Sequence, residues 1–309
     1  MYGKDINEWL NNKREKPEAY DFTKEIVSSI ESNDTSEDAI DRYVIYQATA
    51  PNFNDLDEAQ SILKGHEVYS RSGHADECEL IEGIYGILWP KRILIHCKGG
   101  KWITGETMNS VNTTIDELLK IETGDKSIKQ TIIRYADEGK GGKLLKKSIQ
   151  NYPHAEGFLN AAYTIGNFIP VPVGCNGPRG YQNHDIEDYW DKTLWLIYCW
   201  YQSPDRMKLK KIVKYNKNVS RYEDWLDALG SWDQFVVTNF MQDFVYRGSS
   251  NDQSVFGKPK ELWEDHLKDD AGVLPKLEQL DEFFKNAAEW IFARGARMIN
   301  VLRTKEDIA

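Results

Sequence analysis

The sequence predicts an α+β fold that is dominated by helices and carries one small antiparallel β-sheet. Two observations support this fold class. Apolar residues recur at helical spacing through long segments from Pro153 to about residue 303. Residues 84–104 instead contain short runs rich in Ile, Tyr and Trp, divided by Pro90-Lys91 and Gly99-Gly100, as is typical of strands and turns. We therefore expect helices to form most of the structure, with the sheet packed against them.

Residues 1–83 are predicted to form a helical N-terminal region. A capping-box-like pattern at Thr35 and Asp38 opens one helix, and "DLDEAQSILKG" predicts a short helix that ends at Gly65. The runs "RILIHC" and "KWITG" are then expected to be strands joined by a Gly-Gly hairpin turn. The following "ETMNSVNTTIDELLKI" has its apolar residues on one helical face.

Residues 84–303 are expected to form the main α+β domain, which makes one compact unit with the N-terminal region. A polar segment rich in glycine and lysine predicts a mobile loop near residues 122–150. Beyond it, "DYWDKTLWLIYCWY" is apolar on all sides and predicts a buried helix, and a last long helix is expected at about 278–303. An alternative adds "TIGNFIPVPVG" to the sheet as a third strand.

Composition limits the classes of protein that fit. The 309 residues suffice for a large core, and 12% aromatic residues argue against disorder. A net charge of −10 argues against a general nucleic-acid-binding surface, so a nucleic acid would need a local basic patch. No signal peptide or membrane-length apolar run is visible, which predicts a cytoplasmic protein without membrane contact. The scattered cysteines, which predict reduced thiols and no metal site, are Cys78, Cys97, Cys175 and Cys199.

The most unusual loop, "CNGPRGYQNHDIEDYW", carries the first candidate ligand-binding residues, Asn176 and Arg179. A guanidinium on a loop shaped by glycine and proline suits bidentate capture of a carboxylate or phosphate. The alternative is a surface arginine, or one paired with Asp188 or Asp191 at the start of the next helix. Asp188 is also a candidate base or electrostatic stabiliser.

A second candidate group stands where the predicted hairpin meets a helix. Backbone N–H groups at a helix start bind anions, Glu106 and Ser110 are candidate catalytic residues, and Asn109 is a candidate ligand-binding residue. The alternative is ordinary capping by Thr104, with Glu106 compensating the helix dipole.

Arg294 lies in the apolar stripe of the last helix, between Ile291 and Met298. Such an arginine must extend to solvent, form a structural ion pair or face an anionic ligand, because an unpaired buried charge is costly. Thr164 and Asn167 complete the predicted ligand-binding set.

Several common motifs are absent from the sequence. "GHADEC" lacks the Cys half of a zinc deaminase site, and "TGDKS" and "GKGGK" lack P-loop spacing. No nucleophile elbow or dinucleotide fingerprint is present. His96 is expected to be a strand histidine satisfied by a neighbour.

The ordered series "ITGETMNS", "TIGNFIPVP", "CNGPRG", "DYWDKTLWLIYCWY", "FVVTNFMQDFV" and "FARGARM" resembles an uncharacterised bacterial family of unknown function. The resemblance covers roughly residues 85–303, matches the first 80 residues poorly and departs from the family at Lys192. It implies a shared polar site without a known reaction. The matching positions are Glu106, Ser110, Thr164, Gly166, Asn176, Arg179, Gly180, Asp188, Asp191, Arg294 and Arg297.

Two functions fit these observations. The first is an intracellular enzyme that acts on a nucleotide or other phosphate-bearing ligand, plausibly a toxin or phage-defence effector. Its most specific version is an ADP-ribosyltransferase using NAD, although helix dominance argues against that fold. The second is a non-catalytic helical binding or regulatory protein whose polar residues form a structural network and whose tryptophans suit a protein partner.

Overall fold

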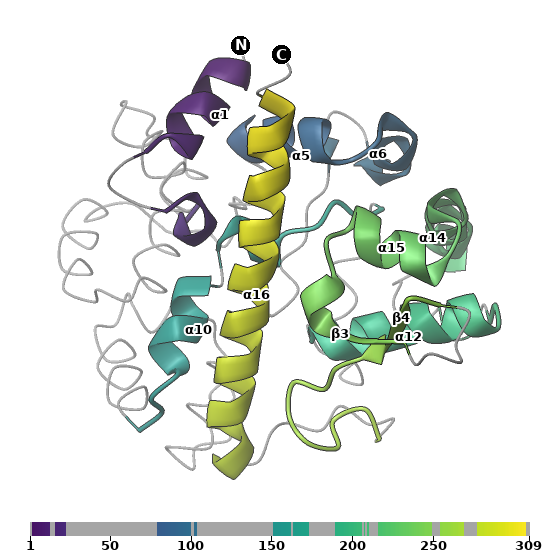
Figure 1. The fold of residues 1–309 in the computed structure, drawn as a ribbon. Coiled ribbons are helices and arrows are strands. Elements are labelled where there is room, and N and C mark those ends of the chain that lie inside the picture. Colours follow the sequence, from purple (N-terminus) through teal and green to yellow (C-terminus); the bar gives the residue numbers. More distant parts are fainter. Residues whose placement is uncertain are drawn as a thin grey trace, which may run out of the picture.

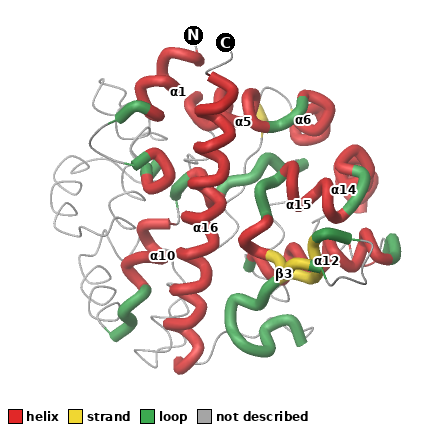
Figure 2. The backbone as a smooth tube through the Cα atoms, in the orientation of Figure 1, coloured by secondary structure: helices red, strands yellow, loops and turns green. Residues whose placement is uncertain are grey.

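The structure of the protein is a computed structural model. It describes residues 2–12, 16–22, 79–99, 102–103, 151–161, 163–172, 189–205, 207, 209, 216–248, 254–268 and 277–306. Helices make up most of these residues, and the long helix α16 (Leu277–Glu306) runs through the middle of the molecule (Figures 1 and 2). The segments predicted as a helix from Thr35, a helix ending at Gly65, a helix after Gly105 and a mobile loop at 122–150 lie outside the described residues.

Helix α16 is the element against which many others pack. It contacts α10 (Ala155–Ala161), η4 (Ile165–Asn167), η1 (Pro17–Ala19), α5 (Glu79–Leu88) and η5 (Gln242–Phe244). The last long helix was expected at this position, and its existence is confirmed. The apolar stripe predicted for it is buried at Leu280, Phe284, Ala287, Ile291 and Met298.

The remaining elements surround α16 or extend to one side of it. Strands β1 and β2 pair in one antiparallel sheet and β3 and β4 in another, among the residues that the structure describes. The helix-dominated α+β class with a small antiparallel sheet is therefore confirmed. The bounds are α1 Tyr2–Leu10, α6 Lys91–Cys97, β1 Lys98–Gly99, β2 Trp102–Ile103, α12 Trp190–Gln202, α14 Asn216–Leu229, α15 Trp232–Thr238, β3 Val245–Arg247 and β4 Phe256–Pro259.

The sheet predicted over residues 84–104 is mostly wrong, because α5 and α6 occupy residues 79–97. In α5, Ile81, Ile84, Tyr85 and Leu88 are buried at the i, i+3, i+4, i+7 spacing of a helix, and Leu80 is buried beside them. This periodicity and burial outweigh the strand preference of β-branched residues. "RILIHC" is likewise helical, so His96 lies on α6 and not on a strand.

Of the predicted hairpin, only the residues beside its turn form strands. Strand β1 pairs with β2 through Lys98 opposite Ile103 and Gly99 opposite Trp102, so each strand is two residues long. The alternative third strand is also wrong, because η4 occupies Ile165–Asn167 and neither sheet includes the segment. Strands β3 and β4 lie instead in a region that was predicted to be mostly helical.

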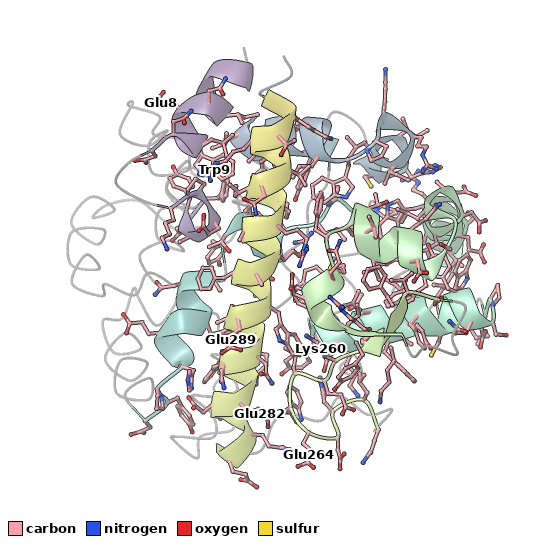
Figure 3. The ribbon with its side chains drawn as sticks, viewed as in Figure 1. Glu8, Trp9, Lys260, Glu264, Glu282 and Glu289 are labelled. Carbon is pink, nitrogen blue, oxygen red and sulfur yellow. The ribbon has the colours of Figure 1, made fainter. Side chains whose placement is uncertain are left out.

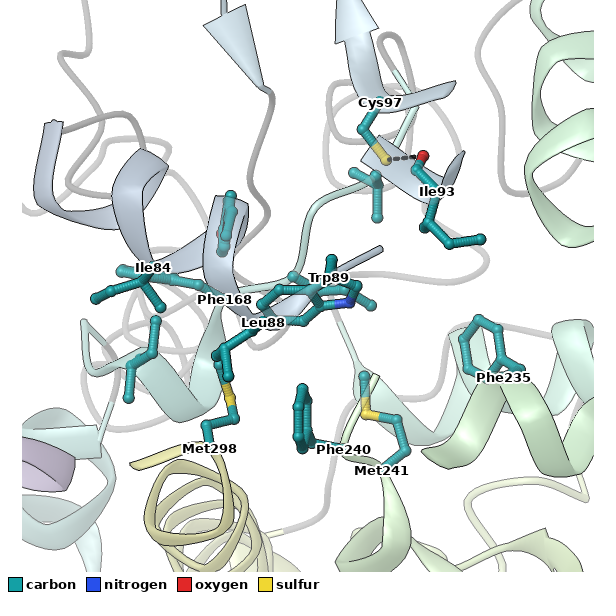
Figure 4. Packing of buried hydrophobic residues seen from close by; sticks show 14 of the residues in the cluster. Ile84, Leu88, Trp89, Ile93, Cys97, Phe168, Phe235, Phe240, Met241 and Met298 are labelled. Carbon is teal, nitrogen blue, oxygen red and sulfur yellow. Dashed lines mark hydrogen bonds between the residues drawn. The ribbon is translucent and has the colours of Figure 1, made fainter. Parts of the chain in front are cut away.

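One continuous core joins the N-terminal helix to the rest of the described chain. In α1, Trp9 is buried while Glu8 is exposed, and the two side chains leave that helix on different sides (Figure 3). Trp89, Phe240 and Met298 meet near the centre of the molecule, where they bring together α5, the end of α15 and α16 (Figure 4).

Helix α15 ends in a left-handed turn at Phe240, whose φ is 60°. The N–H groups of Phe240 and Met241 both donate back into the last turn of the helix, which defines a Schellman C-cap. A non-glycine residue in this conformation costs about 1–2 kcal/mol. Packing of the Phe240 ring on Trp89 offsets that cost, and the turn fixes the position of Asn239 beside it.

Gly166 marks the closest approach between η4 and α16. A Cβ at this position would overlap the Ile291 carbonyl and lie 2.9 Å from the Gly295 nitrogen. No side chain therefore fits between the two backbones, and glycine is required by space alone.

We predict that Gly166→Ala destabilises the fold by more than about 1–3 kcal/mol, because backbone atoms of α16 cannot move aside as a flexible side chain would. Gly86→Ala is the matched control. A Cβ at Gly86 meets nothing within 4 Å, so alanine in α5 should stabilise by about 0.5–1 kcal/mol. Chemical denaturation measures the free energy of unfolding of both variants. Equal values would contradict the close contact between Gly166 and α16.

Candidate functional site

The structure describes three of the nine predicted site residues: Thr164, Asn167 and Arg294. All three are fully buried. The others lie outside the described residues, and their roles stay predictions: Glu106, Asn109, Ser110, Asn176, Arg179 and Asp188.

Arg294 is held by backbone carbonyls. Its Nη1 donates to the carbonyls of Gly166 (2.6 Å) and Phe168 (2.9 Å), and its Nε donates to that of Asn239 (2.9 Å). The guanidinium carbon lies 5.3 Å from the centroid of the Trp190 ring, within cation–π range. One side chain thus ties α16 to the η4 segment, the end of α15 and the start of α12.

The charge of Arg294 is buried without an acidic partner among the described side chains. Nη2 has no hydrogen-bond partner there either. Burial lowers the pKa of the guanidinium to about 9, so it is still protonated at neutral pH. Carbonyl dipoles and an aromatic face therefore compensate this charge. Of the alternatives drawn from the sequence, extension to solvent is wrong and no ion pair is found in the described part of the chain.

Thr164 and Asn167 also use their polar groups within the protein. The Thr164 hydroxyl donates to the Ala161 carbonyl at 2.8 Å, and Asn167 Oδ1 accepts from Trp190 Nε1 at 2.9 Å. These bonds join the η4 segment to α10 and α12. This geometry favours the interpretation of these residues as a structural network.

Asp191 and His266 form a second buried polar pair. His266 Nδ1 lies 2.5 Å from Asp191 Oδ2, which also accepts from the Leu262 N–H at 2.8 Å. The imidazole stacks on the Trp263 ring with centroids 3.4 Å apart. This pair fastens the chain after β4 to the first turn of α12, where Asp191 has His266 as a specific partner.

The His266 ring is positioned as a proton acceptor. Its pKa is lowered, chiefly by burial and also by the positive charge of Lys192, while Asp191 raises it and does not restore the usual value. The neutral imidazole therefore donates Nδ1–H to the carboxylate. Nε2, which has no partner among described residues, keeps its lone pair. Nε2 is itself buried, so this acceptor faces no surface of the described protein.

An open cleft of about 530 Å³ lies between the β3–β4 sheet and α16. Its polar lining consists of Gln242, Asp243, Tyr246, Arg247, Lys260 and Arg297, and its apolar lining of Val245, Val255 and Phe256. Lys260 lies beside α16 in Figure 3, with its Nζ 5.5 Å from the Trp290 ring centroid. The cleft thus brings two arginines and a lysine together in a protein whose net charge is −10.

Asp243 organises two of these cations. Its carboxylate accepts from Arg297 Nε (3.3 Å) and Nη2 (3.0 and 3.1 Å), and its carbonyl accepts from Lys260 Nζ at 2.8 Å. Arg297 Nη1 takes no part in this pair and still carries two N–H donors. Arg247 is exposed on β3 and has no salt bridge to a described side chain.

Sequence reasoning missed this cleft and the Asp191–His266 pair. A signal for the cleft exists, because the runs "FVYRG" and "SVFGKP", which contain Val, Phe and Tyr, flank the polar run "SSNDQ", as in a hairpin. Recognising it would have placed Arg247 and Lys260 on one small sheet, with Arg247 beside its turn and Lys260 beyond its open end. His266 gives no comparable signal, because it meets Asp191 across 75 positions.

Other functional chemistry is limited in the described part of the chain. Burial raises the pKa of the Cys97 thiol, whose Sγ contacts the Ile93 carbonyl in α6, so this cysteine is a poor nucleophile. No group of three or more metal-ligating side chains occurs among the described residues. Within the same ranges, no helix has both the length and the apolar character needed to cross a bilayer.

Comparison with known proteins assigns the chain to a family. Residues 99–298 match the Family of unknown function (DUF6994), which is more than half of the 309 residues, so the protein belongs to that family. The matched range contains α10, α12, the cleft and most of α16. No curated protein and no solved structure matches the chain.

We predict that His266 makes the stability of the fold depend on pH. Because the folded-state pKa lies below the ordinary value of about 6.5, the unfolded chain binds this proton first as the pH falls. The free energy of unfolding should therefore decrease below about pH 6.5, by at most about 1.4 kcal/mol per pH unit, until the folded-state pKa is reached.

His266→Asn is the matched variant, since its amide N–H can replace the Nδ1–H bond to Asp191 without titrating. Denaturation of both proteins should show the stability advantage of the wild type shrinking between about pH 7.5 and pH 5.5. An advantage that grows as the pH falls would show that His266 is protonated in the folded protein.

Proposed function

We propose that the protein binds a nucleotide or another phosphate-bearing ligand in the cleft between the β3–β4 sheet and α16. The observation that supports this proposal is the convergence of Arg247, Lys260 and Arg297 on one open cavity. Guanidinium and ammonium donors form charge-assisted hydrogen bonds with phosphate, and arginine matches its geometry bidentately. A local basic site is what a net acidic protein needs to attract such an anion.

The geometry assigns different tasks to Arg294 and Arg297 of α16. Arg294 is inside the protein and its Nη1 and Nε are used by backbone carbonyls, whereas Arg297 is partly exposed and lines the cleft. The cleft therefore replaces the buried Arg294 group as the proposed place for the phosphate. The buried network itself favours the second candidate function, a binding or regulatory protein without catalysis.

His266 does not line the cleft and its Nε2 is buried, so the catalytic version of the proposal rests on the candidate catalytic residues of the sequence, Glu106, Ser110 and Asp188. A cytoplasmic bacterial toxin or defence effector, with nucleotide-handling or ADP-ribosyl transfer as its reaction, is the corresponding prediction from sequence. NAD therefore belongs among the ligands to be tested.

Isothermal titration calorimetry with pyrophosphate, ATP and NAD tests the proposal. We predict saturable binding of at least one ligand, and a thermal shift that follows it, since ligand at 100 times its Kd stabilises by about 2.7 kcal/mol. Arg247→Gln should weaken binding at least about tenfold, because a charge-assisted hydrogen bond is worth about 1.5–3 kcal/mol.

Arg303→Gln is the control, because it removes the same charge from an exposed position in the last turn of α16. It should bind like the wild type. Absence of binding by the wild type, or equal losses in the two variants, would overturn the proposal.

A further inference from the structure

We infer that the phosphate-bearing ligand of the cleft is a mononucleotide whose base stacks on Tyr246. This inference rests on the proposed function and adds the part of the ligand that phosphate contacts leave undefined. Tyr246 is 48% exposed and lines the same cleft as the basic residues. Large apolar side chains are otherwise mostly buried in the described core, so an exposed ring beside arginines is a feature of this site.

The sheet beside the cleft is irregular, and its extra residue lies on β4, opposite the cleft residues of β3. Successive side chains of a regular strand point to opposite faces, yet Tyr246 and Arg247 both line the cleft. Val245 pairs with Pro259 whereas Arg247 pairs with Phe256, so β4 has one residue more than β3 between these two pairs. A bulge of this kind bends and twists the strand locally and re-aims side chains.

The cleft offers a separate group for each part of a nucleotide. Arginine and lysine donors suit the phosphate, and the Tyr246 ring offers a flat surface on which a base can stack. Gln242 Oε1 is buried in the cleft lining and has no partner among described residues, so it can accept a hydrogen bond from a base amino group or a ribose hydroxyl. Val255, which is 68% exposed, supplies an apolar edge.

Size and charge favour one nucleotide over a nucleic-acid strand. The volume of about 530 Å³ falls within the roughly 300–1,000 Å³ of small-molecule sites. Lys258, whose Nζ lies 6.0 Å from the Tyr246 ring centroid, adds one further cation beside the cleft. A longer strand would extend over the surface of a protein with a net charge of −10, which repels it.

Titrations with AMP and ribose 5-phosphate test the inference, because the two ligands share the phosphate and sugar and differ in the base. AMP should bind the wild type at least about tenfold more tightly, in line with about 1–3 kcal/mol for stacking of one base. Tyr246→Ala should reduce AMP affinity to the level of ribose 5-phosphate and leave ribose 5-phosphate unchanged. Tyr246→Phe, which keeps the ring, should bind AMP like the wild type.

The outcomes of these titrations distinguish the stacked base from the phosphate site. Equal affinities of the wild type for AMP and ribose 5-phosphate would overturn the stacked base and leave the phosphate site standing. An equal loss of affinity for both ligands in Tyr246→Ala would likewise overturn the stacked base. Binding of neither ligand would overturn the mononucleotide, and the phosphate site is overturned as well only if pyrophosphate, ATP and NAD also fail to bind. Much tighter binding of a single-stranded ten-nucleotide DNA than of AMP would replace the mononucleotide by a nucleic acid.

Discussion

The buried guanidinium of Arg294 is the interaction on which the rest of the structure depends. It satisfies carbonyls from the η4 segment and from the end of α15, and it lies against the ring that begins α12. These segments come from distant parts of the chain, and each places a polar backbone group in the interior. Such groups are costly without a donor, so one arginine allows an irregular chain to cross the core beside α16.

Helix α16 also connects the Arg294 contacts to the cleft. Arg297 is three residues beyond Arg294, so it leaves α16 near its boundary with solvent, where Asp243 fixes it in a bidentate pair. Asp243 lies in η5, directly before β3, and the Asp191–His266 pair fastens the chain that follows β4. The Arg297–Asp243 and Asp191–His266 pairs thus hold the chain where it enters β3 and after it leaves β4, and the sheet lines the proposed ligand site.

Long, strongly periodic elements could be predicted from the sequence, whereas the site could not. The stripe from Leu280 to Met298 predicts α16, and an arginine inside that stripe marks Arg294 as unusual. The sequence could not show that its partners are carbonyls, because backbone groups leave no signature in residue types. Residues 84–97 were misread since β-branched residues suit both strands and buried helices. The irregular pairing beside the cleft, with one extra residue in β4, is specified by no residue pattern.

The most direct test compares Arg294→Met with Arg297→Met by chemical denaturation and AMP titration. It asks whether Arg294 stabilises the fold and Arg297 binds the ligand. Arg294→Met should lose several kcal/mol of unfolding free energy, at about 1–3 kcal/mol for each carbonyl left without a donor. Arg297→Met should lose about 1 kcal/mol or less, as for a partly exposed ion pair, while its AMP affinity falls at least about tenfold. A stable Arg294→Met that no longer binds AMP, beside an Arg297→Met that binds it normally, would contradict the account.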